Sequence, residues 1–74
     1  MEYRITCINK AATEDSLMVT ELGGVNAEGE RWTMSVEEAA ELMASGEGIF
    51  FLENARLTGI EPESKQLLRL PSCP

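Results

Sequence analysis

Three glutamates, Glu37, Glu38 and Glu41, come closest in residue type and spacing to a catalytic arrangement. Carboxylates act as general acids and bases where a site withdraws them from water. A short exposed helix, which is where this pattern places them, offers no such burial. The chain contains no histidine, which excludes Ser-His-Asp and Cys-His nucleophile pairs and imidazole metal ligands. We therefore predict no catalytic residue and no enzymatic activity.

Two cysteines, Cys7 and Cys73, lie near opposite ends of the sequence. A disulfide between them would close most of the chain and could add several kcal/mol, about 4 on the loop-entropy model. In a reducing cytosol we expect free thiols instead, Cys7 in a buried strand and Cys73 in a frayed tail at residues 71–74. Two thiols cannot complete a four-ligand zinc site, and Gly23-Gly24 lacks the flanking residues of a phosphate loop. No metal or cofactor is predicted.

The acidic residues are concentrated in one part of the sequence. The chain carries 13 acids against 6 bases, a net charge of −7, and residues 28–63 hold nine of the acids against Arg31 and Arg56. Direct binding to nucleic acid is not expected, because the backbone phosphates would be repelled. The acidic segment is either a solvated surface or a surface for a basic protein partner, with Glu37, Glu38 and Glu41 as candidate contacts.

A chain of 74 residues has room for one core, so residues 1–74 are predicted to form a single small domain. The sequence opens without the apolar run of a signal peptide. Its longest wholly apolar run is Ile49 to Leu52, far short of the roughly 20 residues that span a membrane. We expect a cytoplasmic protein that does not bind membranes.

Alternation of apolar and polar residues, rich in β-branched types, predicts most of the strands. The predicted strands are Tyr3–Ile8, Leu17–Leu22, a short extended segment Glu30–Met34, Ile49–Glu53, Arg56–Ile60 and Lys65–Leu70. Gly23-Gly24 is predicted to turn the chain after the second strand, and Asn54-Ala55 to form the turn of a late hairpin.

Between the third and fourth of these segments the sequence predicts one helix. Ser35 and Glu38 have the spacing of a capping box, and Gly46 stands where a glycine would end the helix. The apolar stripe comprises Val36, Ala39, Ala40 and Met43, with Leu42 at its edge. A helix of about ten residues is too short to be stable alone. We predict an α+β fold, in two layers, with this helix packed on a four- or five-stranded, mainly antiparallel sheet.

Phe50 and Phe51 are neighbours in a predicted strand, so their rings point to opposite faces of the sheet. One ring must therefore lie on the face that the helix leaves uncovered, and it would form an apolar patch there unless loops cover it. An exposed Trp32 would be a further anchor for a partner. The candidate partner-binding residues are Glu37, Glu38, Glu41, Trp32, Phe50 and Phe51.

Four short motifs, in the order YRITCINK, VTELGG, a tryptophan followed by SVEEAAELMASGE, and IFF, cover about residues 3 to 52. In these motifs the chain resembles the DUF3892 family of small proteins. The C-terminal LLRLPSCP differs from the family pattern, and Asp15 and Ser16 stand where the family often has a histidine. The resemblance implies an α+β fold. It implies no site residues, because the function of that family is not established.

The residues favour a small acidic, non-enzymatic interaction module that occupies the surface of a partner protein. One alternative is an acidic, nucleic-acid-mimicking inhibitor of a nucleic-acid-binding protein, such as a phage counter-defence protein, whose binding would be sensitive to salt. Another is a structural protein that forms a homo-oligomer through an edge strand or an open sheet face.

Overall fold

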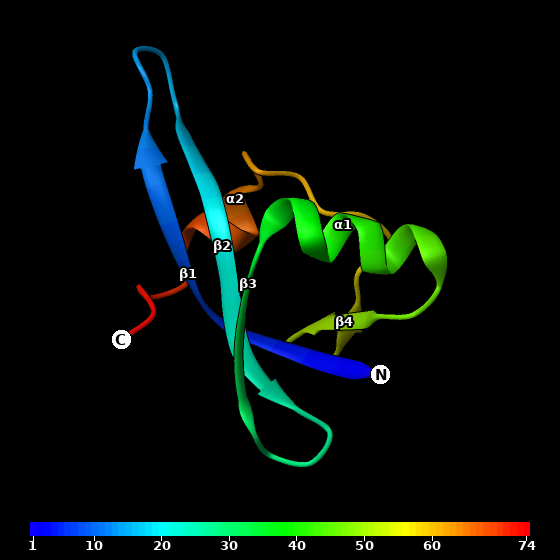
Figure 1. Ribbon diagram of the computed structural model, residues 1–74. Helices are drawn as coiled ribbons and strands as arrows, with labels where there is room; N and C mark the ends of the chain where they lie inside the picture. Colours follow the sequence, from blue (N-terminus) through cyan, green and yellow to red (C-terminus); the bar gives the residue numbers. More distant parts are fainter.

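Five strands form one mixed sheet in the order β3-β2-β1-β4-β5 in the computed structural model, which describes residues 1–74 (Figure 1). The strands are β1 (Glu2–Ala12), β2 (Leu17–Asn26), β3 (Arg31–Ser35), β4 (Ile49–Leu52) and β5 (Ala55–Arg56). The helices are α1 (Val36–Ser45) and α2 (Lys65–Leu68). The pairs β1–β2, β2–β3 and β4–β5 are antiparallel, and β1–β4 is parallel. The predicted small α+β fold is confirmed.

The β1–β2 hairpin is longer than the sequence pattern predicts. Its strands pair from Tyr3–Asn26 to Ala12–Leu17, so residues 9–12 continue β1 beyond its predicted end at Ile8. The turn itself lies at Thr13–Ser16, where the Thr13 hydroxyl donates to the Ser16 carbonyl oxygen. Backbone pairing thus extends the hairpin through polar residues that carry little strand signal.

Gly23 and Gly24 lie inside β2, and the prediction that they turn the chain is wrong. Gly23 pairs with Cys7 and Gly24 with Ile5, and neither glycine has a positive φ. A Cβ on Gly24 would overlap the backbone carbonyl of Arg4, because β1 has a bulge between Ile5 and Cys7. The absence of a side chain at Gly24 therefore allows the backbones of β1 and β2 to approach closely, which is one reason why glycine occurs within strands.

The turn after β2 lies at Asn26–Glu30. The Asn26 side-chain oxygen accepts hydrogen bonds from the backbone N–H groups of Glu28 and Glu30. Gly29 in this loop has φ +81°, a conformation that favours glycine. The sequence signal for this turn is Asn26, two residues beyond the predicted glycine pair, together with Gly29 three residues later.

Helix α1 has the predicted ends. The Ser35 hydroxyl accepts from the Glu38 backbone N–H at 3.1 Å, and Gly46 ends the helix with φ 79°. Ala39 is fully buried, whereas Ala40 is exposed, so the buried stripe is narrower than predicted. Neither α1 nor α2 is long and apolar enough to cross a membrane.

The C-terminal third differs most from the predicted meander. The turn after β4 is Glu53-Asn54, with Glu53 at φ 58°, and β5 has only two residues. The predicted strand Lys65–Leu70 is wrong: its first four residues form α2, where the Ser64 hydroxyl accepts from the Leu67 N–H. Lys, Gln, Leu and Arg are good helix formers, and this segment has no β-branched residue.

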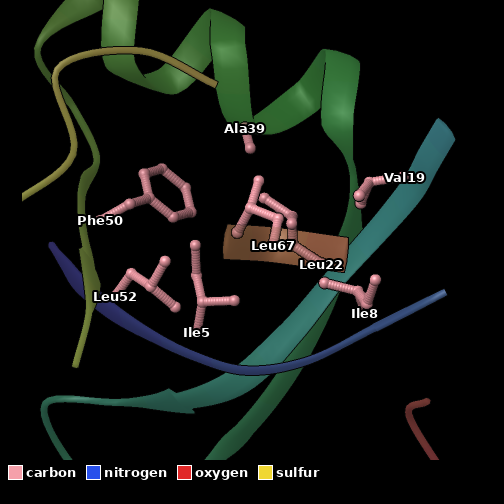
Figure 2. Packing of buried hydrophobic residues seen from close by; sticks show 8 residues of the cluster. All are labelled: Ile5, Ile8, Val19, Leu22, Ala39, Phe50, Leu52 and Leu67. Atoms are coloured by element: carbon pink, nitrogen blue, oxygen red, sulfur yellow. The ribbon is translucent and has the colours of Figure 1, made fainter. Parts of the chain in front are cut away.

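The core lies between the sheet and the two helices (Figure 2). Both helices cover the same face of the sheet, called the inner face here, and the opposite one is the outer face. Side chains from three strands (β1, β2 and β4) and both helices meet there: Ile5, Ile8, Val19, Leu22, Ala39, Phe50, Leu52 and Leu67. The outer face has no helix over it.

Candidate functional site

The two adjacent phenylalanines point to opposite faces, as predicted. Phe50 is 0% exposed and belongs to the core, so its candidacy as a partner-binding residue is wrong. Phe51 is half-buried on the outer face. The pairing explains the difference, because Phe50 lies beside Tyr3 on the inner face and Phe51 lies beside Arg4 on the outer face.

Trp32 is part of an inner-face aromatic cluster with Tyr3 and Phe50. Its ring centroid lies 5.1 Å from that of Tyr3 and 5.8 Å from that of Phe50, both edge-to-face. Trp32 pairs with Gly24 across β3 and β2. Trp32 is half-buried, and its buried Nε1 has no hydrogen-bond partner. We therefore assign Trp32 mainly to packing and not to an exposed anchor.

Residues from all five strands form one line across the outer face. The register pairs Arg31 with Val25, Val25 with Arg4, Arg4 with Phe51, and Phe51 with Arg56. We call these five residues the arginine row. The three arginines are exposed, and Val25 and Phe51 between them are half-buried. Sequence reasoning missed this row because its members come from five separate segments, and only the strand order brings them together.

Two surface depressions lie on either side of Val25. One, of about 230 Å³, includes Arg4, Phe51 and the loop after β2 in its lining. The other, of about 520 Å³, includes Arg31, Cys7 and Cys73. The outer face is therefore hollowed on both sides of Val25.

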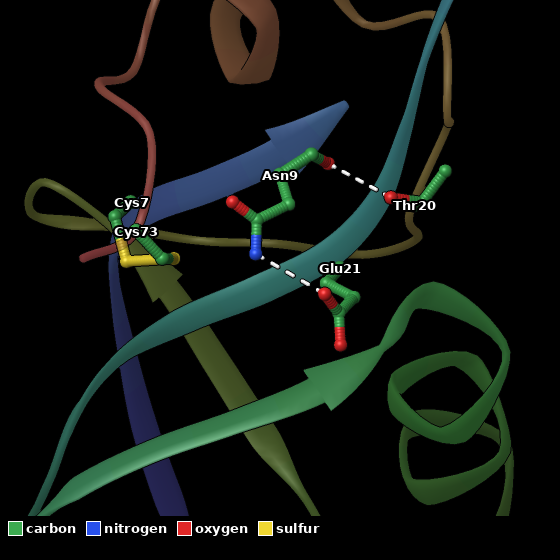
Figure 3. Close-up of a disulfide and its surroundings, with 5 residues drawn as sticks. All are labelled: Cys7, Asn9, Thr20, Glu21 and Cys73. Atoms are coloured by element: carbon green, nitrogen blue, oxygen red, sulfur yellow. Dashed lines mark hydrogen bonds between the residues drawn. A yellow bond between two sulfur atoms is a disulfide. The ribbon is translucent and has the colours of Figure 1, made fainter. Parts of the chain in front are cut away.

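The two cysteines form a disulfide, so the prediction of free thiols is wrong (Figure 3). The C-terminal segment is not a frayed tail either. The Ile8 N–H donates to the Pro71 carbonyl, and the Cys73 N–H donates to the Ile8 carbonyl, each within 3.0 Å. β4 pairs with β1 only at residues 2–5, and the C-terminal segment lies beside β1 further along, at Ile8. Helix α2, which precedes this segment, is held on the sheet by Leu67 in the core.

The far end of the outer face is polar (Figure 3). The Asn9 side-chain amide donates to a Glu21 carboxylate oxygen at 3.1 Å, and the Thr20 hydroxyl donates to the Asn9 carbonyl. The Glu21 carboxylate thus already has a partner within the sheet. Glu21 lies opposite Ser35 of β3, four residue positions along β2 from Val25 in the arginine row.

Helix α1 presents its glutamates to solvent. Glu37, Glu38 and Glu41 are all exposed, as their pattern predicts. Glu38, Glu41 and Glu47 border a shallow depression of about 360 Å³. No group of three or more acidic or cysteine side chains is arranged to hold a metal ion.

The structure therefore has two charged surfaces on opposite layers of the molecule, the acidic surface of α1 and the arginine row of the outer sheet face. Comparison of the chain with models of protein families, with curated proteins and with solved structures found no match.

Proposed function

We propose that the protein is a non-enzymatic interaction module that binds a partner protein through the outer face of its sheet. The observation that carries this proposal is the arginine row, in which Phe51 and Val25 lie half-buried between three exposed arginines on a face without a covering helix. Aromatic residues and arginine are enriched where proteins meet, whereas lysine is depleted there.

A photo-cross-linking residue in place of Phe51 tests this proposal in cells of the source organism. The matched control carries the same residue in place of Glu41, on α1 and on the other layer of the molecule. We expect a discrete cross-linked protein from position 51 and none from position 41. Without an adduct from either position, the interaction module itself is rejected.

The depression at α1 supports a second candidate, an acidic inhibitor that occupies the basic groove of a nucleic-acid-binding protein. Its carboxylates, from Glu38, Glu41 and Glu47, are exposed and gathered around one hollow. Cross-links from position 41 alone would favour this candidate. Charge reversal at Glu38 and Glu41 should then abolish binding, and binding should weaken steeply as salt is raised. Binding unchanged by the reversal would reject the inhibitor.

The compartment in which the module acts belongs to the same proposal. The sequence favours the cytoplasm, whereas a disulfide such as Cys7–Cys73 is typical of oxidising compartments. We propose that the protein functions with this disulfide formed, because the C-terminal segment is fitted against β1 in that state. Alkylation of thiols at the moment of cell lysis, followed by mass measurement, shows whether the protein is oxidised in the cell.

A further inference from the structure

We infer that the arginine row binds an acidic, extended segment of a partner protein; this deepens the proposed function and rests on it. The first ground is the distribution of charge. The chain has six basic residues, and half of them, Arg4, Arg31 and Arg56, lie in this one row. In a protein with a net charge of −7, basic residues aligned on one face complement an anionic partner.

The three guanidinium groups are also free to bind. All three arginines are exposed, and none takes part in the side-chain hydrogen bonds of the protein. A guanidinium group donates two parallel hydrogen bonds to one carboxylate, which makes arginine well suited to carboxylate recognition. Each arginine of the row can therefore accommodate one acidic side chain of the partner.

Acidic residues border the row but do not lie within it. Glu21 lies four residues before Val25 in β2, opposite Ser35, and accepts from Asn9. Glu2 lies beyond Arg4 in β1, opposite Ile49, and borders the smaller depression. Glu30 and Glu53 lie in the loop and the turn beside the row. The positions between the arginines belong to Val25 and Phe51, so no acid separates one guanidinium from the next.

The spacing of the row indicates an extended segment. Neighbouring strands lie about 4.8 Å apart, so Arg4 is about 10 Å from both Arg31 and Arg56 at the backbone. An extended segment in the polyproline II conformation has three residues per turn and advances about 3.1 Å per residue, so acids at every third position lie on one side of it and recur about every 9 Å. Apolar side chains at the two intervening positions would then point to either side of the row, where the two depressions beside Val25 can receive them.

A protein segment fits this surface better than a single-stranded nucleic acid. Nucleic acid carries a phosphate at every nucleotide, and the remaining acids of this chain would repel that charge. Proteins that bind single strands stack successive bases on aromatic rings, and Phe51 is the one aromatic ring in the row. An oligonucleotide is nevertheless a useful competitor, because it would reveal the opposite preference.

The experiment measures binding of a fluorescein-labelled nine-residue peptide with three Glu-Pro-Val repeats to the whole oxidised protein, by fluorescence anisotropy at low salt. The matched peptide has Gln in place of each Glu. The protein variants are Arg4→Gln, at the centre of the row, and Arg69→Gln, an exposed arginine next to α2 that loses the same group. Thermal unfolding of each variant verifies that it folds.

We expect the Glu peptide to bind and the Gln peptide to bind at least about fivefold more weakly. Arg4→Gln should weaken binding about fivefold or more, and Arg69→Gln should leave it unchanged. Equal binding of both peptides, equal loss in both variants, or tighter and Arg4-dependent binding of an oligothymidylate would each overturn the inference. Absence of peptide binding would also overturn it, and cross-links from position 51 would then show that the interaction module itself survives.

Discussion

The Cys73 sulfur lies directly over Gly23, so that a Cβ on this glycine would stand only 2.7 Å from it. The Cys7 sulfur would be 2.8 Å from the same Cβ. Gly23 pairs with Cys7 across β2 and β1, which places the disulfide on top of the glycine. The glycine is thus part of what lets the C-terminal segment close onto the sheet.

Gly23→Ala should destabilise the oxidised protein by about 1 to 3 kcal/mol, the usual cost of an overpacked site. The same change in a Cys7→Ala/Cys73→Ala background should cost clearly less, because both sulfurs are gone. Urea denaturation of the four proteins gives the coupling energy between the sites. Equal costs in the two backgrounds would show that the disulfide does not create the requirement for glycine.

Gly24→Ala should be more damaging than Gly23→Ala, and equally so with or without the disulfide. Its Cβ would overlap the Arg4 carbonyl, which is backbone and cannot rotate away. We expect a loss above about 3 kcal/mol, in the range that follows from severe core disruption. The free energy of unfolding of Gly24→Ala in the cysteine-free background is the measurement, and a loss below about 1 kcal/mol would contradict this account of the bulge.

Removal of the disulfide should lower the free energy of unfolding by about 2 to 4 kcal/mol, because Cys7 and Cys73 are 66 residues apart and their link restricts the unfolded chain. The Cys7→Ala/Cys73→Ala protein should also lose protection from hydrogen exchange at the Ile8 and Cys73 amides, which bond across this contact. Met43→Leu, a volume-conserving change elsewhere, is the control. Unchanged protection at both amides would mean that the backbone bonds alone hold the segment.

Ser35→Ala should destabilise the protein by about 1 kcal/mol, since the Ser35 hydroxyl caps the first turn of α1. Ser45→Ala, at the other end of the helix, should cost less, because that hydroxyl donates to a carbonyl within the last turn. Thermal unfolding of both variants gives the comparison. If Ser45→Ala proved the more costly change, the N-terminal cap would not be what fixes the start of α1.

Alanine at Phe50 and at Phe51 should separate stability from binding. Phe50→Ala removes a fully buried ring and should cost about 3 to 5 kcal/mol. Phe51→Ala removes a half-buried ring of the outer face, should cost much less stability, and should weaken binding of the acidic peptide. Denaturation and anisotropy measure the two effects. A Phe51→Ala protein that binds the peptide as well as wild type would remove Phe51 from the site.

Local signals determined the parts of the fold that neighbouring residues can specify. The cap at Ser35, the glycine end of α1 at Gly46, and the opposite directions of Phe50 and Phe51 depend on spacing within a few residues, and all three were predictable. Helix geometry and strand alternation follow from the same short-range rules.

Other local predictions failed because a tertiary contact decided between two conformations. Gly23 and Gly24 are compatible with a turn, but the bulge of β1 and the disulfide require glycines inside a strand. By contrast, the strand predicted for Lys65–Leu70 failed on local grounds, because these residues are good helix formers and Ser64 caps the helix; Leu67 then fills the core against β1 and β2.

The candidate site was beyond the reach of sequence reasoning for a related reason. Arg4, Arg31 and Arg56 are scattered over 53 positions, and in the sequence two of them appear only as minority charges in an acidic segment. They come into line because β4 crosses over to pair with β1, which sets the strand order and the register. The sequence by itself determined residue composition, net charge and local elements; long-range pairing decided which side chains share a face, because strand register depends on contacts between distant segments.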